Sequence, residues 1–256
     1  MRFKDRVVVI TGGGSGMGLA TSKLFASEGA TVAVNDIKAE TAAKAVSEIE
    51  AAGGKAFAIP GDVSSRDVAQ KSVKEVIARC GRIDILINNA GIATIQPAEE
   101  YSEWERITGV DLDAPFYWSQ AAGALTMIPG KGGAIVNISS LAGHVAYPGD
   151  VGYIAAKAGV LGLTRSLAIE WAKHGIRVNC ICPGFTDTQI IKDMEAIDPD
   201  RFVERRRRVP MGRAARPEEI AKAVAFLASD DASYITGAIL NADGGQIALS
   251  SGWSPA

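Results

Sequence analysis

Short runs of apolar residues recur along the chain and alternate with longer segments whose apolar positions are three or four residues apart. The short runs are rich in β-branched residues and show little polar alternation, which is typical of parallel strands buried on both faces. Each run is therefore predicted to be a strand. The predicted strands cover residues 7–10, 31–34, 56–59, 83–87, 134–138, 176–181 and 238–240.

The segments between the strands have helical periodicity. Ala42, Ala45, Val46 and Ile49 follow the spacing i, i+3, i+4, i+7, which places them on one face of a helix. Similar stripes within 160–167 and 220–227 predict two more helices with core-facing sides. Strands that alternate with helices form right-handed β-α-β units. The sequence therefore predicts an α/β protein with one parallel sheet and helices on both of its faces.

One region breaks this alternation, between Pro183 and Pro217. It contains two short helical patterns and four consecutive arginines, 205–208. An insertion after the carboxyl end of a strand is well placed to cover a ligand, so residues 185–216 are predicted to form a substrate lid. The arginines are expected to form a solvated helix face or a subunit contact, and the alternative is a site for an anionic substrate such as an acyl-carrier thioester.

Composition narrows the class of protein. The chain has 256 residues, 47% hydrophobic content and a net charge of -2, which suits one large core and predicts neither a nucleic-acid nor a membrane partner. No apolar run approaches the roughly 20 residues that span a bilayer. The N-terminus lacks the apolar core of a signal peptide. Three cysteines and two histidines show no zinc spacing. We expect a single-domain cytoplasmic protein over 1–256 with no metal.

The first predicted strand leads into a glycine-rich turn, Thr11-Gly12-Gly13-Gly14-Ser15-Gly16-Met17-Gly18, and then a helix. Such a turn lets the backbone approach a pyrophosphate, and the following helix N-terminus offers it free N–H groups. Asp36 ends the second strand, where a carboxylate can accept hydrogen bonds from ribose hydroxyls and repel a 2′-phosphate. Because neither the glycine turn nor Ile37 supplies a basic residue, the expected cofactor is NAD and not NADP.

Two further segments follow strands at the same predicted edge. Asp62-Val63 comes after the third strand, where a side chain can reach an adenine. Asn88-Asn89-Ala90-Gly91 follows the fourth, and its small residues allow the backbone to pass close to a cofactor. Its amides can also tie neighbouring strands together, and this structural role is the larger one expected here.

Tyr153 and Lys157 lie four residues apart, so they share one face of a helix predicted over 152–173. A tyrosine titrates near 10, and a nearby ammonium favours its phenolate. The phenol can then act as general base towards an alcohol or as general acid towards a ketone. Ser140 follows the fifth strand, where its hydroxyl can hold the substrate oxygen beside Tyr153. Ser139 is the competing serine and is expected to point away.

Taken together, these motifs resemble those of the short-chain dehydrogenase/reductase family over essentially the whole chain. The resemblance rests on Thr11-Gly12 to Gly18, Asn88 to Gly91, Ser140, Tyr153 with Lys157, and Pro183-Gly184 with Thr188. It implies a Rossmann-like doubly wound fold with a seven-stranded parallel sheet. It also implies an oxidoreductase acting between NAD and a secondary alcohol or ketone, and a homotetramer in which helices near 102–127 and 152–173 pair across one interface. The cofactor contacts implied by the motifs and their positions are Gly12, Ser15, Gly16, Met17, Gly18, Asp36, Asp62, Val63, Asn89, Ala90, Gly91, Tyr153, Lys157, Pro183, Gly184, Thr186 and Thr188.

The chain departs from the family pattern at Asp111. The family usually has an asparagine there, which helps to hold a water connected to the active-site lysine. Asp111 can still accept a hydrogen bond from that water, and its charge near Lys157 is expected to raise the pKa values of the lysine and of Tyr153. We therefore count Asp111 with Ser140, Tyr153 and Lys157 as catalytic residues of an active enzyme. The alternative is a weakened or repurposed site.

The substrate pocket is expected to form from the loop after Ser140, the start of the tyrosine helix and the 185–216 segment. Its candidate residues are Ser140, Ala142, His144, Tyr147, Asp150, Tyr153, Phe185 and the 189–194 stretch. His144 and Asp150 are polar and can bind hydroxyls of a polyol or sugar alcohol; the alternative is that they face solvent. Trp253 in the C-terminal tail is a candidate to cover a neighbouring subunit's site.

Three functions remain open. The first is an NAD-dependent dehydrogenase of secondary alcohols or polyols. The second is a 3-oxoacyl-thioester reductase, which Asp36 disfavours because such enzymes usually prefer NADPH. The third is a dinucleotide-sensing protein without turnover, which the intact Ser140, Tyr153 and Lys157 argue against.

Overall fold

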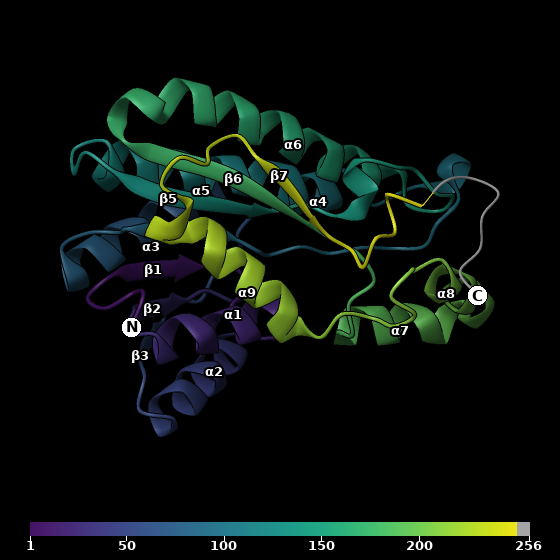
Figure 1. The fold of residues 1–256 in the computed structure, drawn as a ribbon, viewed down its shortest axis with the longest axis horizontal. Coiled ribbons are helices and arrows are strands. Elements are labelled where there is room, and N and C mark those ends of the chain that lie inside the picture. The colour runs from purple at the N-terminus through teal and green to yellow at the C-terminus, as the bar shows by residue number, and fades with distance from the viewer. Residues whose placement is uncertain (250–256) are drawn as a thin grey trace.

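The computed structural model describes residues 1–249. It contains one seven-stranded sheet in the order β3-β2-β1-β4-β5-β6-β7, and every neighbouring pair is parallel (Figure 1). The strands are β1 (Val7–Ile10), β2 (Thr31–Val34), β3 (Lys55–Ala58), β4 (Ile85–Asn88), β5 (Gly133–Ile138), β6 (Ile176–Pro183) and β7 (Ile239–Ala242). The predicted doubly wound fold is confirmed, and the strand bounds differ from the predicted ones by at most two residues at each end.

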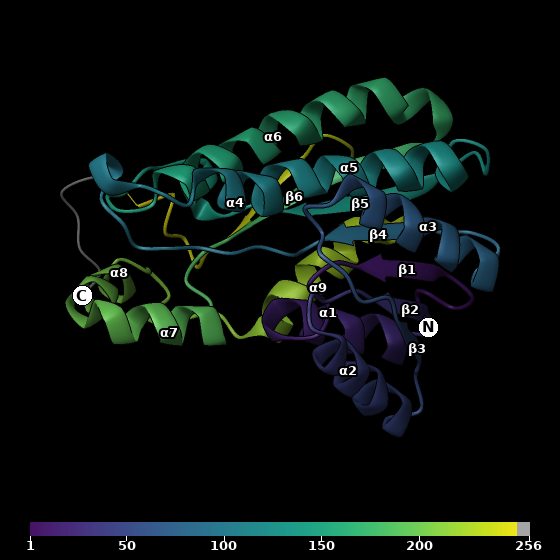
Figure 2. The ribbon, with the colours of Figure 1, turned by 180° about the vertical axis from the view of Figure 1, so that it is seen from behind.

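Helices cover both faces of this sheet. On one face lie α1 (Gly16–Ser27), α2 (Ala39–Ala51) and α9 (Pro217–Ala228); on the other lie α3 (Arg66–Cys80), α4 (Trp104–Thr108), α5 (Ala114–Ala122) and α6 (Val151–Trp171) (Figures 1 and 2). The side chains of β1 divide between the two layers: Val8 and Ile10 join the core under α1, α2 and α9, and Val7 and Val9 join the other core. Because both faces of the strand are buried, its sequence reads as a continuous apolar run.

The helix predicted over 102–127 is built from four consecutive pieces. The first piece is α4 and the third is α5. Two π-helical turns, Gly109–Asp113 and Gly123–Met127, follow α4 and α5 respectively, without a break in the helix. A π-helical turn inserts an extra residue into an α-helix and often occurs at functional sites. Asp111 lies in the first of these turns, where it is fully buried.

The 185–216 segment leaves the carboxyl end of β6 and forms α7 (Gln189–Ile197) and α8 (Pro199–Arg207) before α9 begins. It has a small core of its own, in which Phe185, Met194, Phe202 and Val209 pack against Ala93 and other residues of the loop after β4. The two short helices that the sequence predicts in this region are therefore present. They lie beyond the ends of the strands, away from the main helical layers (Figure 1).

No helix within residues 1–249 combines the length and the apolar character that a membrane crossing needs. Trp253, the tail residue predicted to cover a neighbouring site, lies outside the described residues.

Candidate functional site

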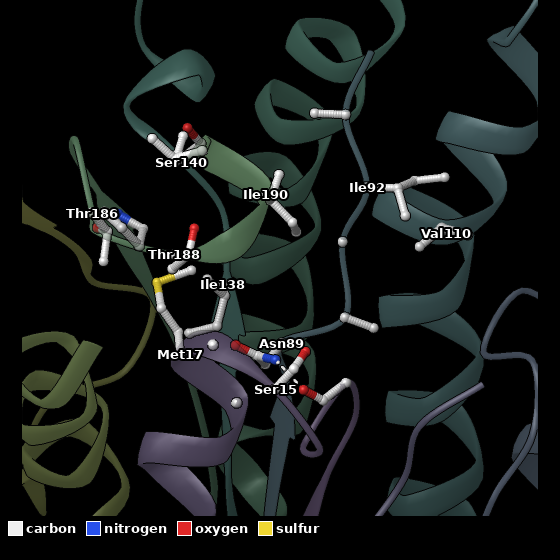
Figure 3. Close-up of a pocket in the computed structure, with 18 of the residues that line it drawn as sticks. Ser15, Met17, Asn89, Ile92, Val110, Ile138, Ser140, Thr186, Thr188 and Ile190 are labelled. Carbon is white, nitrogen blue, oxygen red and sulfur yellow. Dashed lines mark hydrogen bonds between the residues drawn. The ribbon is translucent and has the colours of Figure 1, made fainter. Parts of the chain in front are cut away.

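A cavity of about 340 Å³ opens at the carboxyl ends of β1, β2, β4, β5 and β6. Parallel sheets bind ligands at this edge, where the direction of the crossover connections changes. Figure 3 shows Ser15, Met17 and Asn89 at one end of the cavity and Ser140 at the other. Every residue that the sequence assigns to the cofactor lines this cavity, from Gly12 to Thr188.

The glycine-rich turn is shaped by contacts that leave no space for side chains. Gly12 has a φ of +59°, and a Cβ on it would lie 2.9 Å from the Cα of Ala90. A Cβ on Gly18 would overlap the carbonyl oxygen of Gly12. The helix α1 starts at Gly16, and the Ser15 side chain makes no capping hydrogen bond to its first N–H groups. These N–H groups face the end of the cavity where an anion is favoured.

The Asn89 segment connects this turn to β4. The Asn89 side-chain amide donates to the carbonyls of Thr11 (2.9 Å) and Gly12 (3.1 Å). In return, the Thr11 hydroxyl accepts from the backbone amides of Asn89 (3.0 Å) and Ala90 (3.1 Å). The neighbouring Asn88 donates to Asn137 on β5 (2.8 Å). The amides thus tie neighbouring strands together, as expected, and hold the turn against the cavity.

Asp36 lies at the end of β2 with only 9% of its surface exposed. Its Oδ1 accepts from the backbone amide of Lys38 at 3.1 Å. A Cβ on Gly14 would lie 2.7 Å from the other carboxylate oxygen, so the glycine turn lies against this side chain. Asp62 is engaged more locally, because its Oδ1 accepts from the amide (2.9 Å) and hydroxyl (2.8 Å) of Ser64.

Tyr153, Lys157 and Ser140 all line the other half of the cavity. Lys157 is only 3% exposed, and its Nζ donates to the carbonyl of Ile138 at 3.1 Å. The Ser139 hydroxyl donates to the Lys157 carbonyl at 2.8 Å, so it is engaged with α6, whereas Ser140 hydrogen-bonds with Tyr153. The arrangement of the two serines therefore agrees with the prediction that Ser140 is the serine beside the tyrosine.

The environment of Tyr153 disfavours its charged form when the cavity holds protein groups alone. Burial is the main cause that raises the pKa of the phenol, and the Asp111 carboxylate raises it further. The hydrogen bond with Ser140 acts in the opposite direction. Lys157 Nζ lies 5.4 Å from the centre of the tyrosine ring, close enough to favour the phenolate when it forms.

Asp111 contacts Lys157 directly. Its Oδ1 lies 2.7 Å from Lys157 Nζ, and its Oδ2 accepts from the backbone amide of Ile92 at 3.1 Å. Burial raises the pKa of this carboxyl, while the ammonium and the amide oppose the rise. A Cβ on Gly91 would lie 2.7 Å from Oδ1, so the glycine makes room for the pair. Both carboxylate oxygens therefore face donors, an arrangement that a single amide oxygen cannot supply.

Three of the predicted substrate contacts lie elsewhere. Ala142 is buried, and its backbone amide donates to the Ser140 hydroxyl at 3.1 Å. His144 is an exposed residue whose imidazole hydrogen-bonds with the Cys182 thiol. Asp150 is fully buried, accepts from the Tyr101 hydroxyl at 3.2 Å, and has its pKa raised to about 6 by burial. None of the three lines the cavity, so the structure gives no support to their assignment as substrate contacts, which stays a prediction. Phe185 and Tyr147 do line it.

The sequence interpretation missed several apolar residues that line the cavity. Ile92 and Ala93 follow Gly91 directly, Val110 precedes Asp111 in the π-helical turn, and Ile138 ends β5 (Figure 3). Their places beside residues already assigned are the only signal that the sequence offers. Ile190, Ile191 and Met194 of α7, which belong to the predicted 189–194 stretch, also line the cavity, together with Arg205 from α8.

The residues present fit a nicotinamide dinucleotide. Along the sheet edge the cavity joins a buried carboxylate at the end of β2, a helix N-terminus free of side-chain capping after β1, and the Ser140–Tyr153–Lys157 group beyond the end of β5, in that order. Gly12 and Gly18 remove the side chains that would otherwise fill the turn. A pyrophosphate, a ribose and a reacting ring each have a matching region of the cavity.

Comparison with known proteins places this geometry among oxidoreductases. Residues 12–246 match the family model described as enoyl-(acyl carrier protein) reductase. A meso-2,3-butanediol dehydrogenase of Serratia marcescens is 41% identical, covering 97% of each chain. A 3-oxoacyl-[acyl-carrier-protein] reductase of Thermotoga maritima is 40% identical, covering 96% of this chain and all of the relative. Among solved structures, a putative gluconate 5-dehydrogenase from Beutenbergia cavernae, described with NADP bound at low occupancy, is 37% identical with a TM-score of 0.91, covering 97% of this chain and 100% of its own.

Proposed function

Because the chain belongs to the short-chain dehydrogenase/reductase family, we propose that it interconverts secondary alcohols and ketones with NAD, using Tyr153 as general acid and base. The observation that carries this proposal is the convergence of Ser140, Tyr153 and Lys157 on the cavity that the glycine turn and Asp36 also line. Three separate segments of the chain meet there in the arrangement that proton transfer requires.

Each residue has a distinct task in the proposed reaction. When bound, the dinucleotide exchanges a hydride with the substrate carbon. The Ser140 hydroxyl holds the substrate oxygen, and the Tyr153 phenolate removes the alcohol proton or, in reverse, the phenol donates it. Lys157 supplies positive charge beside the phenolate, and Asp111 with the Ile138 carbonyl fixes the position of that ammonium. Asp111 is therefore a positioning residue that acts through Lys157.

We propose NAD as the preferred cofactor because of the charges at the adenosine end. Asp36 lines the cavity there, and a carboxylate in that position repels the 2′-phosphate of NADP. Among the described residues that line the cavity, the basic ones are Lys157 and Arg205, and neither belongs to the glycine turn or to the end of β2. The relative described with NADP makes a direct comparison of the two cofactors necessary.

A second candidate is reduction of 3-oxoacyl thioesters, because one relative at 40% identity carries that name. The substrate side of the cavity is largely apolar, with Ile92, Phe185 and Met194 among its residues, and would accept an acyl chain as well as a small alcohol. We propose that the 185–216 segment covers either substrate.

The protein is further proposed to be a cytoplasmic homotetramer, and the exposed apolar Ile169 on α6 supports a contact through that helix.

The test is a substrate panel followed by nicotinamide absorbance. Wild type and Tyr153→Phe are each assayed with NAD and NADP on 2,3-butanediol, cyclohexanol, gluconate and a 3-hydroxyacyl thioester. We expect NAD-dependent turnover of a secondary alcohol that falls about 100- to 10,000-fold in Tyr153→Phe, which is the range for loss of a general acid–base. Tyr234→Phe, a change at a fully exposed tyrosine, is the matched control and should leave activity intact.

Two results would contradict the proposal. Tight dinucleotide binding without turnover of any substrate would favour a sensing protein. Turnover confined to the thioester with NADP would favour the second candidate.

A further inference from the structure

The four consecutive arginines at the end of α8 have different surroundings. Arg205 is half-buried and lines the cavity, whereas Arg206, Arg207 and Arg208 are exposed. Arg206 is neutralised by Glu195, whose carboxylate lies 2.9 Å from its guanidinium. The exposure of Arg206, Arg207 and Arg208 fits the predicted solvated helix face or subunit contact, whereas the position of Arg205 fits the alternative, a site for an anionic substrate.

Aromatic rings hold the Arg205 guanidinium in place. Its Cζ lies 4.7 Å from the centre of the Tyr147 ring and 5.3 Å from that of Phe202. Phe202 is fully buried in the small core of the 185–216 segment, and Tyr147 comes from the loop after β5. A guanidinium stacked on aromatic faces is held in position and keeps its N–H donors free at the ring edges, so it is pre-organised for a ligand.

The charge of Arg205 is not neutralised by the protein. Within residues 1–249, no carboxylate lies within ion-pair distance of it, whereas Arg206, Arg213 and Arg216 on the same side of the fold each have an acidic partner. A cation that lines a partly apolar cavity without an anionic partner loses hydration and does not gain the energy of an ion pair. Such a group is commonly paired with an anionic ligand.

Arg205 acts on the same space as the catalytic tyrosine. Its charge is among those felt by the Tyr153 phenol, and both side chains line the cavity. The same cavity is lined by apolar Phe185 and Met194 of the 185–216 segment, which pack with Phe202 below Arg205. A small molecule bound there has one polar end at Ser140 and Tyr153, a carbon skeleton along these apolar side chains, and its other end at Arg205.

We propose that the substrate is a hydroxy acid or oxo acid whose carboxylate is bound by Arg205 while its hydroxyl or carbonyl oxygen meets Ser140 and Tyr153. This inference rests on the proposed function and names its substrate class. A guanidinium matches a carboxylate with two parallel N–H donors, which makes Arg205 a specificity-determining residue. A 3-oxoacyl thioester is neutral near its reacting carbon and would gain little from this cation.

The decisive experiment compares one carbon skeleton with and without the charge. Values of kcat/KM are measured for cis-4-hydroxycyclohexanecarboxylate and for its methyl ester, with wild type, Arg205→Met, Arg205→Lys and Arg207→Met. Wild type should prefer the acid by about 10- to 100-fold, the range expected for a charge-assisted hydrogen bond. In Arg205→Met this preference should disappear through loss of acid turnover, while turnover of the ester changes less than about threefold.

The other variants separate charge from structure. Arg205→Lys keeps the positive charge and should retain part of the preference, and Arg207→Met, an exposed arginine two residues away on α8, should behave as wild type. Equal loss of acid and ester turnover in Arg205→Met would assign Arg205 a structural role and overturn the inference. So would a wild-type enzyme that favours the ester, or an unchanged preference in Arg205→Met.

Failure of the inference can be distinguished from failure of the proposed function. Turnover of cyclohexanol with NAD but no preference for the acid would refute the carboxylate site and leave the dehydrogenase intact. If nothing is turned over, binding decides: cyclohexanecarboxylate should quench the fluorescence of the NADH complex of wild type at lower concentration than cyclohexanecarboxamide. Equal binding of the two, or the same difference in Arg205→Met, would overturn the inference.

Discussion

The two ends of the cavity are built from different parts of the polypeptide. At the cofactor end, glycines shape the surface: Gly12, Gly16 and Gly18 lie within seven residues of one another, and side chains on Gly12 and Gly18 would collide with neighbouring backbone. At the substrate end, the cavity is lined by Ser140 and Tyr153, which lie thirteen residues apart, and by Arg205 of α8, which comes 52 residues after Tyr153. The cofactor end is thus a local structure, whereas the substrate end depends on how distant segments pack.

This difference predicts different responses to mutation. A change at the cofactor end should act through steric exclusion and affect every substrate equally. A change at the substrate end should act through charge or shape and separate one substrate from another. A change in the Lys157–Asp111 ion pair should affect both ends of the cavity, because Lys157 and Asp111 contact residues of each half.

The largest effect is expected for Gly18→Ala. The added Cβ would overlap the Gly12 carbonyl oxygen and lie 2.6 Å from the Asn89 side-chain nitrogen, so the turn must move. We expect unfolding free energy to fall by about 3 kcal/mol, as for overpacking of a tight site, and dinucleotide binding to be lost. Chemical denaturation and titration with NADH measure the two effects.

Gly162→Ala is the matched control for this change. Gly162 lies in α6, and a Cβ there has no atom within 4 Å. Alanine is a better helix former than glycine by about 1 kcal/mol, so this variant should be as stable as wild type or slightly more stable. Normal NADH binding by Gly18→Ala would show that the turn is not built on steric exclusion, and the contrast between the two ends would fail.

Asp111→Asn should have the next largest effect. The asparagine side chain has one oxygen where Asp111 has two, so it cannot accept from both Lys157 and the Ile92 amide. Its NH2 group would then face one of these two buried donors. The cost in unfolding free energy is expected to be about 2 kcal/mol. Asp113→Asn is the control, because Asp113 lies in the same π-helical turn and is exposed.

The same variant tests electrostatic tuning of Tyr153. The Asp111 carboxylate is one of the causes that raise the pKa of the phenol, so removing its charge should lower that pKa. Alcohol oxidation requires the phenolate, and its rate rises as pH passes through this pKa. The rising limb of the pH–rate profile of Asp111→Asn should therefore move to lower pH. An unmoved profile would leave Asp111 with a purely structural role.

The smallest effect is expected for Asp36→Ser, which removes a charge from the cofactor end without adding bulk to the glycine turn. Loss of the carboxylate should lower kcat/KM with NAD and raise it with NADP, moving their ratio by about tenfold to 100-fold. Glu40→Gln, an exposed acid in the first turn of α2 that does not line the cavity, should not move the ratio. A ratio that stays constant in Asp36→Ser would remove the structural basis for NAD preference.

The contrast between a local cofactor end and a substrate end built from distant segments also explains which features could be predicted from the sequence. The strands and the glycine turn follow from patterns within a few residues, so their positions were predicted to within two residues. Tyr153 and Lys157 are four residues apart on one helix, and they were found for the same reason. Asp150 and His144 were assigned to the substrate because they are polar residues in an apolar loop. The burial of Asp150 against Tyr101 and the contact of His144 with Cys182 depend on packing between distant segments.

Two features had no local signal. Nothing in the sequence distinguishes Arg205 from Arg206, Arg207 and Arg208, because the rotation of α8 over Phe202 decides which arginine enters the cavity. The direct contact between Asp111 and Lys157 was also not predicted: the family pattern suggested an intervening water. That contact depends on the π-helical turn over Gly109–Asp113, which periodicity does not reveal.

The number of residues in the π-helical turn Gly109–Asp113 affects the geometry of the site. An α-helix advances about 100° per residue, so an extra residue in one turn rotates everything before it relative to everything after it. Loss of one residue from 109–113 would restore regular α geometry and rotate α4 about its axis relative to α5. This rotation would move Asp111 away from Lys157, although every residue of the motifs would still be present. In this stretch a deletion would alter catalysis more than most substitutions, because the spacing of the helix, and not only its residues, holds the ammonium in position.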